Sequence, residues 1–159
     1  MEPFLIPFKS HHVEYLRMRP LDEKVFLSVP HSPREVMAYE RGGYSWTGIC
    51  SSTDTEHCVP TILGMGGVTP IWKGVACAWL LTGCSIEKYK KFLHRTVTNV
   101  LNEAIKNLGL HRIETTILVS HNVSQRWAER LGFANEGLLK KFDSNKNDYY
   151  RYALVKPWI

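Results

Sequence analysis

The sequence lacks the features that direct a chain into a membrane or a secretory pathway. No stretch approaches the roughly 20 uninterrupted apolar residues of a membrane-spanning helix. The most apolar run, residues 74–81, has the length of a strand. The first ten residues contain Glu2 and two prolines and lack a basic segment followed by an apolar one, as a secretory signal would have. We therefore expect a cytoplasmic protein that makes no use of a membrane.

Metal motifs, repeats and linkers are also missing. The four cysteines form no Cys-x-x-Cys pair, and a zinc site would need the scattered Cys50, His57 and Cys58, so we expect no metal and buried thiols. There is no repeat period, low-complexity segment or long linker. A chain of 159 residues has the usual size of one domain and can bury roughly 70% of the surface of its unfolded form. We predict a single domain spanning residues 1–159.

Positive charge is in excess. Twenty Lys and Arg against 15 Asp and Glu give +5 at pH 7 with neutral histidines. This balance favours anionic partners, which include nucleic acid, a phosphorylated cofactor or an acidic surface. The tryptophans are spread through the chain, whereas stacking on bases needs aromatic side chains on one exposed basic face, so nucleic acid is the least favoured of the three.

Hydrophobic periodicity predicts a mixed α and β chain. Helical signals cover residues 11–18 and 33–41, residues 22–29 are ambiguous, and a glycine-rich stretch at 66–74 is compatible with a bulge or wide turn. The predicted strands are residues 4–8, 44–51, 60–65, 75–81, 112–119, 134–142 and 148–155, of which the last two form a hairpin. Asn122 and Gln125 have the spacing of a capping box that opens a short helix ending at Gly132.

The clearest element is a long amphipathic helix over residues 86–108. Apolar residues recur at helical spacing, with Ser85 as an expected cap before them and Gly109 as the stop after them. The strands on either side of this helix form a crossover unit, which lays them parallel. The carboxyl ends of both strands then feed helix N-termini at one edge of the sheet, where anions such as phosphate bind.

Residues 120–139, with the sequence SHNVSQRWAERLGFANEGLL, resemble a conserved block of the GNAT family of N-acetyltransferases. In that family an Asn-led turn opens a short helix that ends in Leu-Gly-Phe, followed by Glu-Gly and a closing hairpin. The order of elements is similar too. The resemblance implies an α+β fold with a mixed central sheet of six to seven strands, a splayed parallel pair and about four flanking helices.

The same resemblance implies an enzyme that transfers an acetyl group from acetyl-coenzyme A directly to an amine, carried by a protein or a small molecule. In the family the pantetheine arm pairs with the strand before the long helix, and the pyrophosphate rests on the N-terminus of that helix. The cofactor-binding residues implied here are Trp79, Leu80, Leu81, Gly83, Ser85, Lys88, Lys90, Lys91, Asn122, Ser124 and Trp127.

The chain departs from the family pattern at two places. The usual cofactor loop has two closely spaced glycines, whereas the stretch 82–91 has only Gly83, with lysines that either compensate or form a solvated helix face. Many relatives carry a Tyr that protonates the leaving thiolate, and Ala128 stands at that position. His121, whose unperturbed pKa is near 6.5, is the best visible proton carrier, unless it is a turn histidine bonded to backbone. Glu40 is a weaker catalytic candidate.

Within the superfamily, the chain looks most like the GNAT-like proteins of tailed phages, which share a strand ending like Trp79-Leu80-Leu81 and a Lys-rich helix start. This second likeness implies the cytoplasm of the host, or association with the virion. It also leaves open an alternative function, a catalytically silent protein that binds a phage or host protein.

Overall fold

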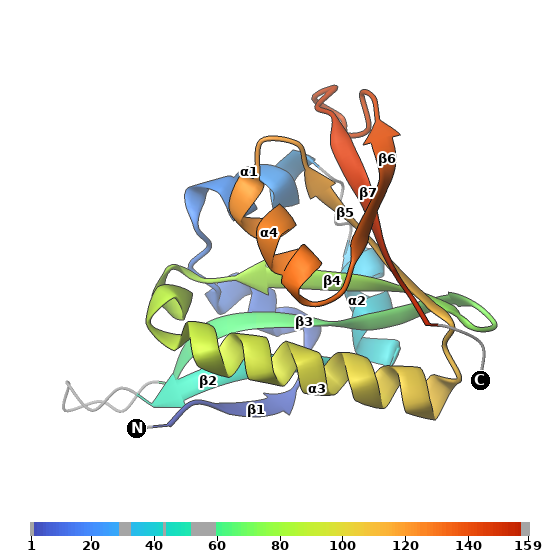
Figure 1. Ribbon diagram of the computed structural model, residues 1–159. Coiled ribbons are helices and arrows are strands. Elements are labelled where there is room, and N and C mark those ends of the chain that lie inside the picture. The colour runs from blue at the N-terminus through green and yellow to red at the C-terminus, as the bar shows by residue number, and fades with distance from the viewer. Residues whose placement is uncertain (1, 29–32, 43, 52–59, 157–159) are drawn as a thin grey trace.

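We analysed a computed structural model of the chain, which describes residues 2–28, 33–42, 44–51 and 60–156. The strands are β1 (Phe4–Pro7), β2 (Ser45–Ser51), β3 (Pro60–Trp72), β4 (Val75–Thr82), β5 (Arg112–Leu118), β6 (Ala134–Leu139) and β7 (Tyr149–Val155). The helices are η1 (Ser10–Tyr15), α1 (Pro20–Ser28), α2 (Pro33–Arg41), η2 (Cys84–Tyr89), α3 (Lys90–Leu108) and α4 (Asn122–Arg130), where η marks a 3-10 helix. Figure 1 shows their arrangement.

The strands form one mixed seven-stranded sheet in the order β1-β2-β3-β4-β5-β7-β6. All neighbours are antiparallel except β4 and β5, the parallel pair that the crossover through α3 predicts. β7 lies between β5 and β6, so the hairpin adds its second strand on the inside. The predicted mixed sheet with one parallel pair is confirmed.

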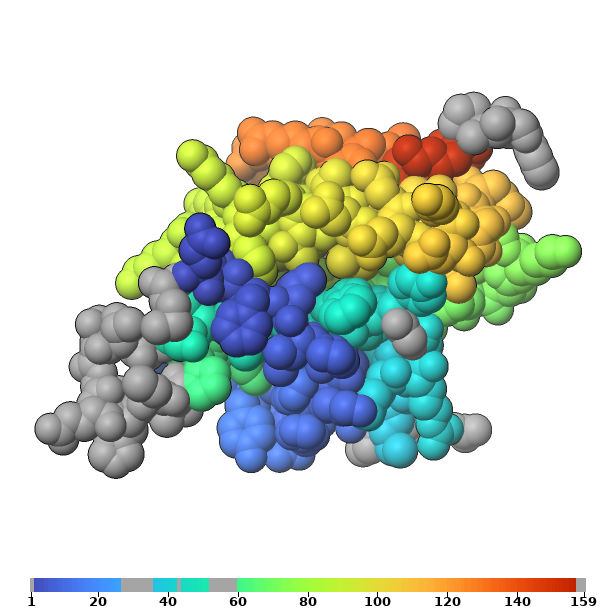
Figure 2. Space-filling view, turned by 90° about the horizontal axis from the view of Figure 1, so that it is seen from below, coloured from blue at the N-terminus to red at the C-terminus, as the bar shows by residue number. Residues whose placement is uncertain are grey.

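Helices cover both faces of the sheet. On one face, α3 and α4 pack over Ala76 and Ile113, both fully buried. On the other face, η1 and α2 pack over Met65, with Phe8 and Val36 in the same cluster. Figure 2 views the molecule from the β1 edge and shows α3 in yellow on one side and the segment from η1 to α2, blue to cyan, on the other. The described residues contain no helix long and apolar enough to cross a bilayer.

Three predicted elements differ from the structure. The 11–18 segment is a 3-10 helix that ends at Tyr15, and the ambiguous 22–29 segment is α1, which begins at Pro20. The predicted strand 60–65 continues to Trp72, with Gly66 and Gly67 inside β3. The bulge and turn expected in the stretch 66–74 come later, between Pro70 and Trp72 and at residues 73–74. Residues 134–142 and 148–155 pair as predicted but over the shorter ranges of β6 and β7.

The helix ends also correct two predicted caps. Ser85 does not cap the long helix, because a 3-10 turn precedes it and α3 begins only at Lys90. The cap of α4 is His121, whose ring accepts from the backbone N–H of Ser124, so the Asn122 and Gln125 capping box is wrong. Gly109 ends α3 as predicted, with φ of 59°, a left-handed conformation that glycine adopts without strain.

Candidate functional site

The parallel strands β4 and β5 separate soon after they begin. Their register covers only three pairs, Val75 with Arg112, Ala76 with Ile113, and Cys77 with Glu114. Beyond them β4 continues along β3 and β5 continues along β7, and Figure 1 shows their carboxyl ends pointing apart. From residue 78 onward, the backbone of β4 therefore has no ladder partner on its β5 side. Such an opening lets an extended ligand complete the ladder.

Trp79, Leu80 and Leu81, three of the predicted cofactor residues, all lie on this unpartnered stretch of β4. The Trp79 side chain lies on the face of η1 and α2, where it stacks on Tyr39 at 4.5 Å and meets the edge of Phe8 at 5.1 Å. Its indole Nε1 is buried and has no hydrogen-bond partner among the described residues. Leu81 packs in the same cluster.

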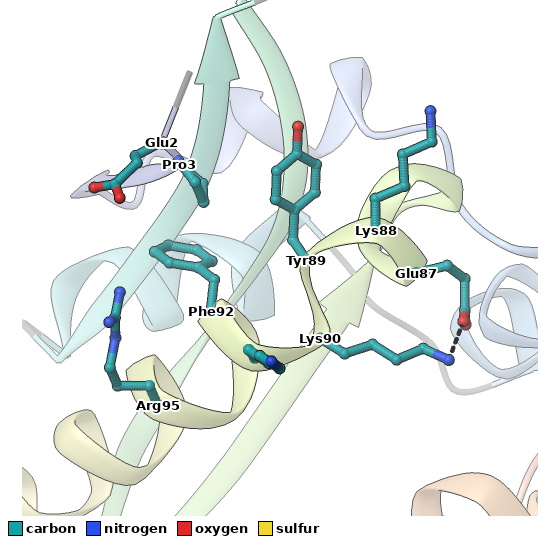
Figure 3. A pocket seen from close by; sticks show the side chains of 9 residues that line it. Glu2, Pro3, Glu87, Lys88, Tyr89, Lys90, Phe92 and Arg95 are labelled. Carbon is teal, nitrogen blue, oxygen red and sulfur yellow. Dashed lines mark ion pairs between the residues drawn. The ribbon is translucent and has the colours of Figure 1, made fainter.

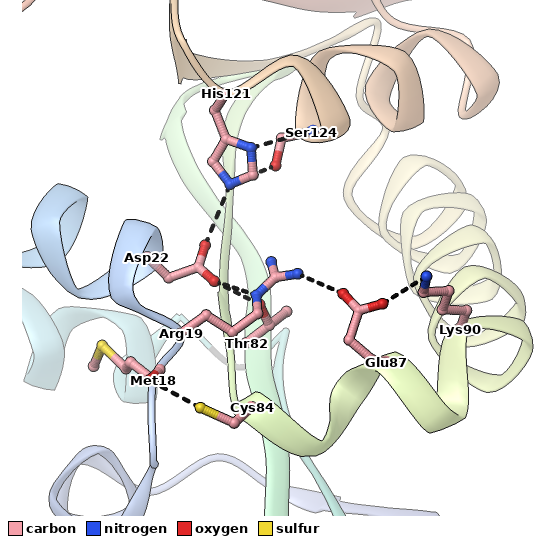
Figure 4. A network of polar contacts seen from close by, with 9 residues as sticks. All are labelled: Met18, Arg19, Asp22, Thr82, Cys84, Glu87, Lys90, His121 and Ser124. Carbon is pink, nitrogen blue, oxygen red and sulfur yellow. Dashed lines mark hydrogen bonds and ion pairs between the residues drawn. The ribbon is translucent and has the colours of Figure 1, made fainter.

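His121, the predicted proton carrier, lies just beyond the end of β5 and is 9% exposed. Its Nδ1 accepts a hydrogen bond of 3.4 Å from the backbone N–H of Ser124. Its Nε2 lies 3.1 Å from Ser124 Oγ and 3.6 Å from Asp22 Oδ1 (Figure 4). His121 and Ser124, both predicted site residues, are thus in direct contact at the mouth of the gap.

Asp22, which sequence reasoning missed, connects the ends of the two separating strands (Figure 4). Its Oδ2 accepts from Thr82 Oγ1 at the end of β4 (3.0 Å) and from Arg19 Nε (2.6 Å), while Oδ1 faces His121 beyond β5. Burial opposes ionisation, but the hydrogen bonds from His121, Arg19 and Thr82 prevail and lower the pKa of Asp22. Pro20 followed by acidic residues is a helix-start signal that would have found α1 and with it this carboxylate.

Glu87 in η2 extends this network toward the long helix. Its carboxylate accepts from Arg19 Nη1 at 3.1 Å and pairs with Lys90 Nζ. The hydrogen bond from Lys90 is the main cause of the lowered pKa of Glu87. In this structure, Lys90, a predicted cofactor residue, is therefore paired with a carboxylate of the protein itself.

The other predicted residues of the loop lie around the start of α3. A pocket of about 580 Å³ is lined there by Lys88, Lys90 and Lys91, together with aromatic side chains and Arg95 (Figure 3). Its lining includes no residue of β4, β5 or α4, so it is distinct from the gap between the strands. Gly83 donates its N–H to the Leu63 carbonyl at 2.8 Å, and Ser85 lies within η2.

The remaining predicted residues belong to α4. Trp127 donates from Nε1 to His94 Nδ1 at 3.2 Å, a contact that ties α4 to α3 on one face of the sheet. Asn122 is exposed in the first turn of the helix. His94, on the exposed side of a helix with no motif around it, was not found from the sequence.

Glu40, the second catalytic candidate, lies at the end of α2 and is engaged elsewhere. Its carboxylate accepts from the backbone N–H of Ser10 at 2.9 Å and from Lys9 Nζ at 3.1 Å. The backbone hydrogen bond from Ser10, followed by that from Lys9, lowers the pKa of Glu40 to about 2. The structure thus pairs Glu40 with η1, whereas it pairs His121 with α1 and α4.

The described residues contain no group of three or more His, Cys, Asp or Glu side chains placed to hold a metal ion. His57 and Cys58, which a zinc site would need, lie outside the described residues. Cys50, Cys77 and Cys84 are thiols outside any disulfide. Cys50 is buried and Cys77 partly buried, whereas Cys84 is exposed, so the expectation of buried thiols is wrong for Cys84.

The fold is that of GNAT-family acetyltransferases. No protein-family profile matches the sequence, and no curated protein matches it. Among solved structures, it is similar to a GNAT-family acetyltransferase from Bacillus anthracis, with 18% identity, a TM-score of 0.66, and coverage of 98% of this chain and 95% of that one.

Two further structures cover almost the whole chain. One is the NatC complex bound to Gag peptide and CoA, with 14% identity, a TM-score of 0.72, and coverage of 99% of this chain and 100% of that one. The other is a mutant spermidine N-acetyltransferase from Vibrio cholerae, with 14% identity, a TM-score of 0.64, and coverage of 96% and 94%. At these identities the similarity shows the fold.

Proposed function

We propose that this protein is an N-acetyltransferase that transfers an acetyl group from acetyl-coenzyme A to an amine without a covalent enzyme intermediate. The observation that carries the proposal is the separation of β4 from β5 after three residue pairs. It leaves unpartnered strand backbone beside a helix start, a combination suited to a long ligand with amide groups and phosphates. A solved structure with the same fold holds CoA and a peptide.

The residues present fit such a cofactor. Backbone groups of Trp79, Leu80 and Leu81 on the open side of β4 would pair with the amides of the pantetheine arm. Lys88, Lys90 and Lys91 are exposed at the start of α3 and would neutralise phosphate charge. Trp127 and His94 form a wall on the face of α3 and α4 that would contact the remainder of the cofactor.

The bound cofactor supplies an activated acetyl thioester. In the transfer, the amine nitrogen forms a bond to the acetyl carbon, the carbon–sulfur bond breaks, and the proton lost by nitrogen ends on sulfur, which gives an amide and a free thiol. An amine with a pKa of about 10.4 is protonated at neutral pH, so the site must first take up its proton. We propose that His121 takes up this proton at Nδ1, once the 3.4 Å hydrogen bond from the Ser124 N–H opens, while its Nε2 stays beside the Asp22 carboxylate.

The two substrates would approach from opposite faces of the sheet. α3 and α4 border the cofactor side, and the surface beside η1, α1 and α2 is left for the amine. The acceptor is a protein or a small molecule, as in the neighbours whose structures contain a peptide or whose names include spermidine.

Cofactor binding is tested by the shift in thermal midpoint on adding acetyl-CoA, with CoA and ATP as comparisons. A ligand at 100 times its dissociation constant adds about 2.7 kcal/mol, which is a shift of several degrees for a domain of this size. Trp127→Ala removes part of the wall and is expected to reduce the shift. Trp72→Ala is the matched control, because Trp72 is 65% exposed on the β3–β4 hairpin, away from the gap.

Stabilisation of the wild type and Trp72→Ala by acetyl-CoA but not by ATP, with a smaller shift in Trp127→Ala, supports the proposal. Release of free thiol with a panel of amines then measures transfer. No shift at millimolar acetyl-CoA would overturn the proposal and favour a silent GNAT-fold protein that binds a phage or host protein.

A further inference from the structure

A ladder of four charged side chains, Arg112, Glu114, Glu136 and Arg151, lies where β4 and β5 begin to separate. Cys77 and Glu114 face each other as the last pair of the parallel strands, and Thr116 pairs with Arg151 of β7 two residues further on. Because side chains alternate along a strand, the residues of these two pairs share the face of Trp79, which carries η1 and α2. This is the face from which the proposed function brings the amine.

The two arginines of this ladder are used differently. Arg112 donates from Nε to Glu114 and from Nη1 and Nη2 to the two oxygens of Glu136. Arg151 makes one contact, from Nη1 to Glu114 Oε1 at 2.6 Å. Its Nε is buried and has no hydrogen-bond partner among the described residues, although a buried donor without a partner is costly. All three nitrogens of Arg112 thus donate to a carboxylate, whereas the Nε of Arg151 does not.

In the two carboxylates of the ladder, in contrast, every oxygen already accepts a hydrogen bond. Glu114 accepts from Arg151 with one oxygen and from Arg112 with the other, and both oxygens of Glu136 accept from Arg112. Among these four side chains, the buried nitrogen left without an acceptor is Nε of Arg151. The group that would complete the ladder is therefore an acceptor, and the planar fork of a guanidinium matches a carboxylate best.

The positive charge of Arg151 also acts on Cys77, at the point where the strands separate. Burial and the nearby Glu114 raise the pKa of the Cys77 thiol, while the guanidinium of Arg151 opposes them. The Arg151 side chain is 32% exposed, so it combines contact with buried groups and access from outside. An anion on Arg151 would thus lie close to the gap in which the thioester is proposed to lie.

We infer that Arg151 is a binding residue for a carboxylate that the acceptor carries a few bonds from its reactive amine. This inference rests on the proposed function. It assigns the acceptor to amines with a nearby carboxylate, found in free acidic amino acids and in peptides that begin with an acidic residue, and not to polyamines.

The experiment compares acceptors that differ only in this group. Initial rates with acetyl-CoA are measured for glutamate against glutamine α-amide, in which both carboxylates are replaced by amides, for peptides that begin with Asp against Asn, and for spermidine. In one of the two pairs, the wild type is expected to prefer the acceptor that carries the carboxylate. The pair that shows this preference identifies whether the acceptor is a free amino acid or a peptide. Arg151→Gln is expected to raise KM for the preferred acceptor roughly ten- to a hundredfold and to leave KM for its amide counterpart within about twofold.

Two further variants make the result specific. Arg151→Lys keeps the charge but loses the fork, so an intermediate KM is expected. Arg130→Gln removes the same charge from the exposed last turn of α4 and is expected to behave as wild type. The thermal shift with acetyl-CoA, unchanged in all three variants, shows that they are folded and that the cofactor side is intact.

A product-like probe separates this inference from the proposed function. N-acetylaspartate carries carboxylates and needs no turnover, so its affinity is measured calorimetrically for wild type and Arg151→Gln. Binding that weakens at least tenfold in the variant supports the subsite even if no amine is acetylated. Equal affinity in the two proteins, or turnover without preference for a carboxylate, overturns it, whereas loss of acetyl-CoA binding in the wild type overturns the proposed function alone.

Discussion

Asp22 is the residue on which the mouth of the gap depends. Its carboxylate is a shared partner for Thr82 on one strand end, His121 beyond the other, and Arg19 just before its own helix. Removing it leaves three polar groups without their anion, and the loss is larger than that of a surface ion pair because the carboxylate is only 16% exposed.

We therefore expect Asp22→Ala to lower the free energy of unfolding by about 1–3 kcal/mol at pH 7. Glu23→Ala, at the exposed neighbouring position of α1, is the control and is expected to have little effect. Because folding lowers the pKa of Asp22 from its ordinary value of 3.8, the stabilisation that Asp22 contributes is complete above pH 3.8. This stabilisation is lost as the pH falls through the folded-state pKa. Urea unfolding of wild type and Asp22→Ala at pH 7, 5 and 3 measures the loss. A difference from wild type that persists at full size at the lowest pH would contradict the assignment.

In the proposed complex, Glu87 would compete with the cofactor phosphates for the same cations. Its carboxylate is half exposed and pairs with both Arg19 and Lys90. Glu87→Gln removes the competing charge, so we expect the dissociation constant for acetyl-CoA to fall roughly two- to fivefold, in keeping with the modest strength of exposed ion pairs. Glu103→Gln, which removes the same charge from an exposed position of α3, is the control. Calorimetric titration decides, and weaker binding in Glu87→Gln would show that Glu87 supports the site instead.

Among the elements, β3 contains two adjacent glycines, Gly66 and Gly67, which are typical of turns but here allow close packing of two strand backbones. A Cβ at Gly67 would clash with the Tyr44 carbonyl and lie 2.7 Å from Ser45 Cα on the neighbouring strand. We expect Gly67→Ala to cost about 1–3 kcal/mol, as overpacking does. At Gly48, on β2 of the same strand pair, the nearest atom would be 3.5 Å away, so Gly48→Ala is expected to change stability by less than about 1 kcal/mol. Urea unfolding of both variants checks the contrast, and equal effects would refute it.

The same element explains which parts of the fold the sequence could predict. Long periodic patterns such as α3, and the alternation in β5, depend on many residues, so their type followed from the sequence. The extension of β3 through Gly66 and Gly67 depends on the neighbouring strand, which no local pattern records. The 3-10 turn of η2 likewise depends on contacts with other segments, since Cys84 donates its N–H to the Arg17 carbonyl.

The candidate site likewise has parts that the sequence predicts and parts that it does not. The backbone stretch at Trp79 and the position of His121 followed from the strand–helix–strand pattern and from the family resemblance. The helix-start signal at Pro20 could have located Asp22, but the contacts of Asp22 and Arg151 could not be predicted, because their main partners come from segments distant in sequence. Charged residues of this kind are common on surfaces, and only the tertiary fold shows which of them are buried and shared.

At the scale of the whole molecule, the gap between β4 and β5 makes a prediction for backbone protection. Amide groups of residues 78–82 that face β5 have no ladder partner there, whereas those that face β3 do. We expect the first group to exchange hydrogen with solvent much faster than the second and to become protected when acetyl-CoA binds. Hydrogen exchange resolved by residue measures this. Protection that changes only around the pocket of Lys88 and Lys91 would place the cofactor elsewhere.

The position of β7 has a consequence for the order in which the chain assembles. The first four strands are neighbours in sequence and in space, so they can pair one after another as the chain emerges from the ribosome. β6 is made before β7 but its backbone pairs with the sheet only through β7, and β5 has just three pairs with β4. Until residues 149–155 have been synthesised, the nascent chain therefore holds an incomplete sheet with an exposed edge, and the proposed acceptor side, begun by η1, α1 and α2, is completed only when Arg151 is added.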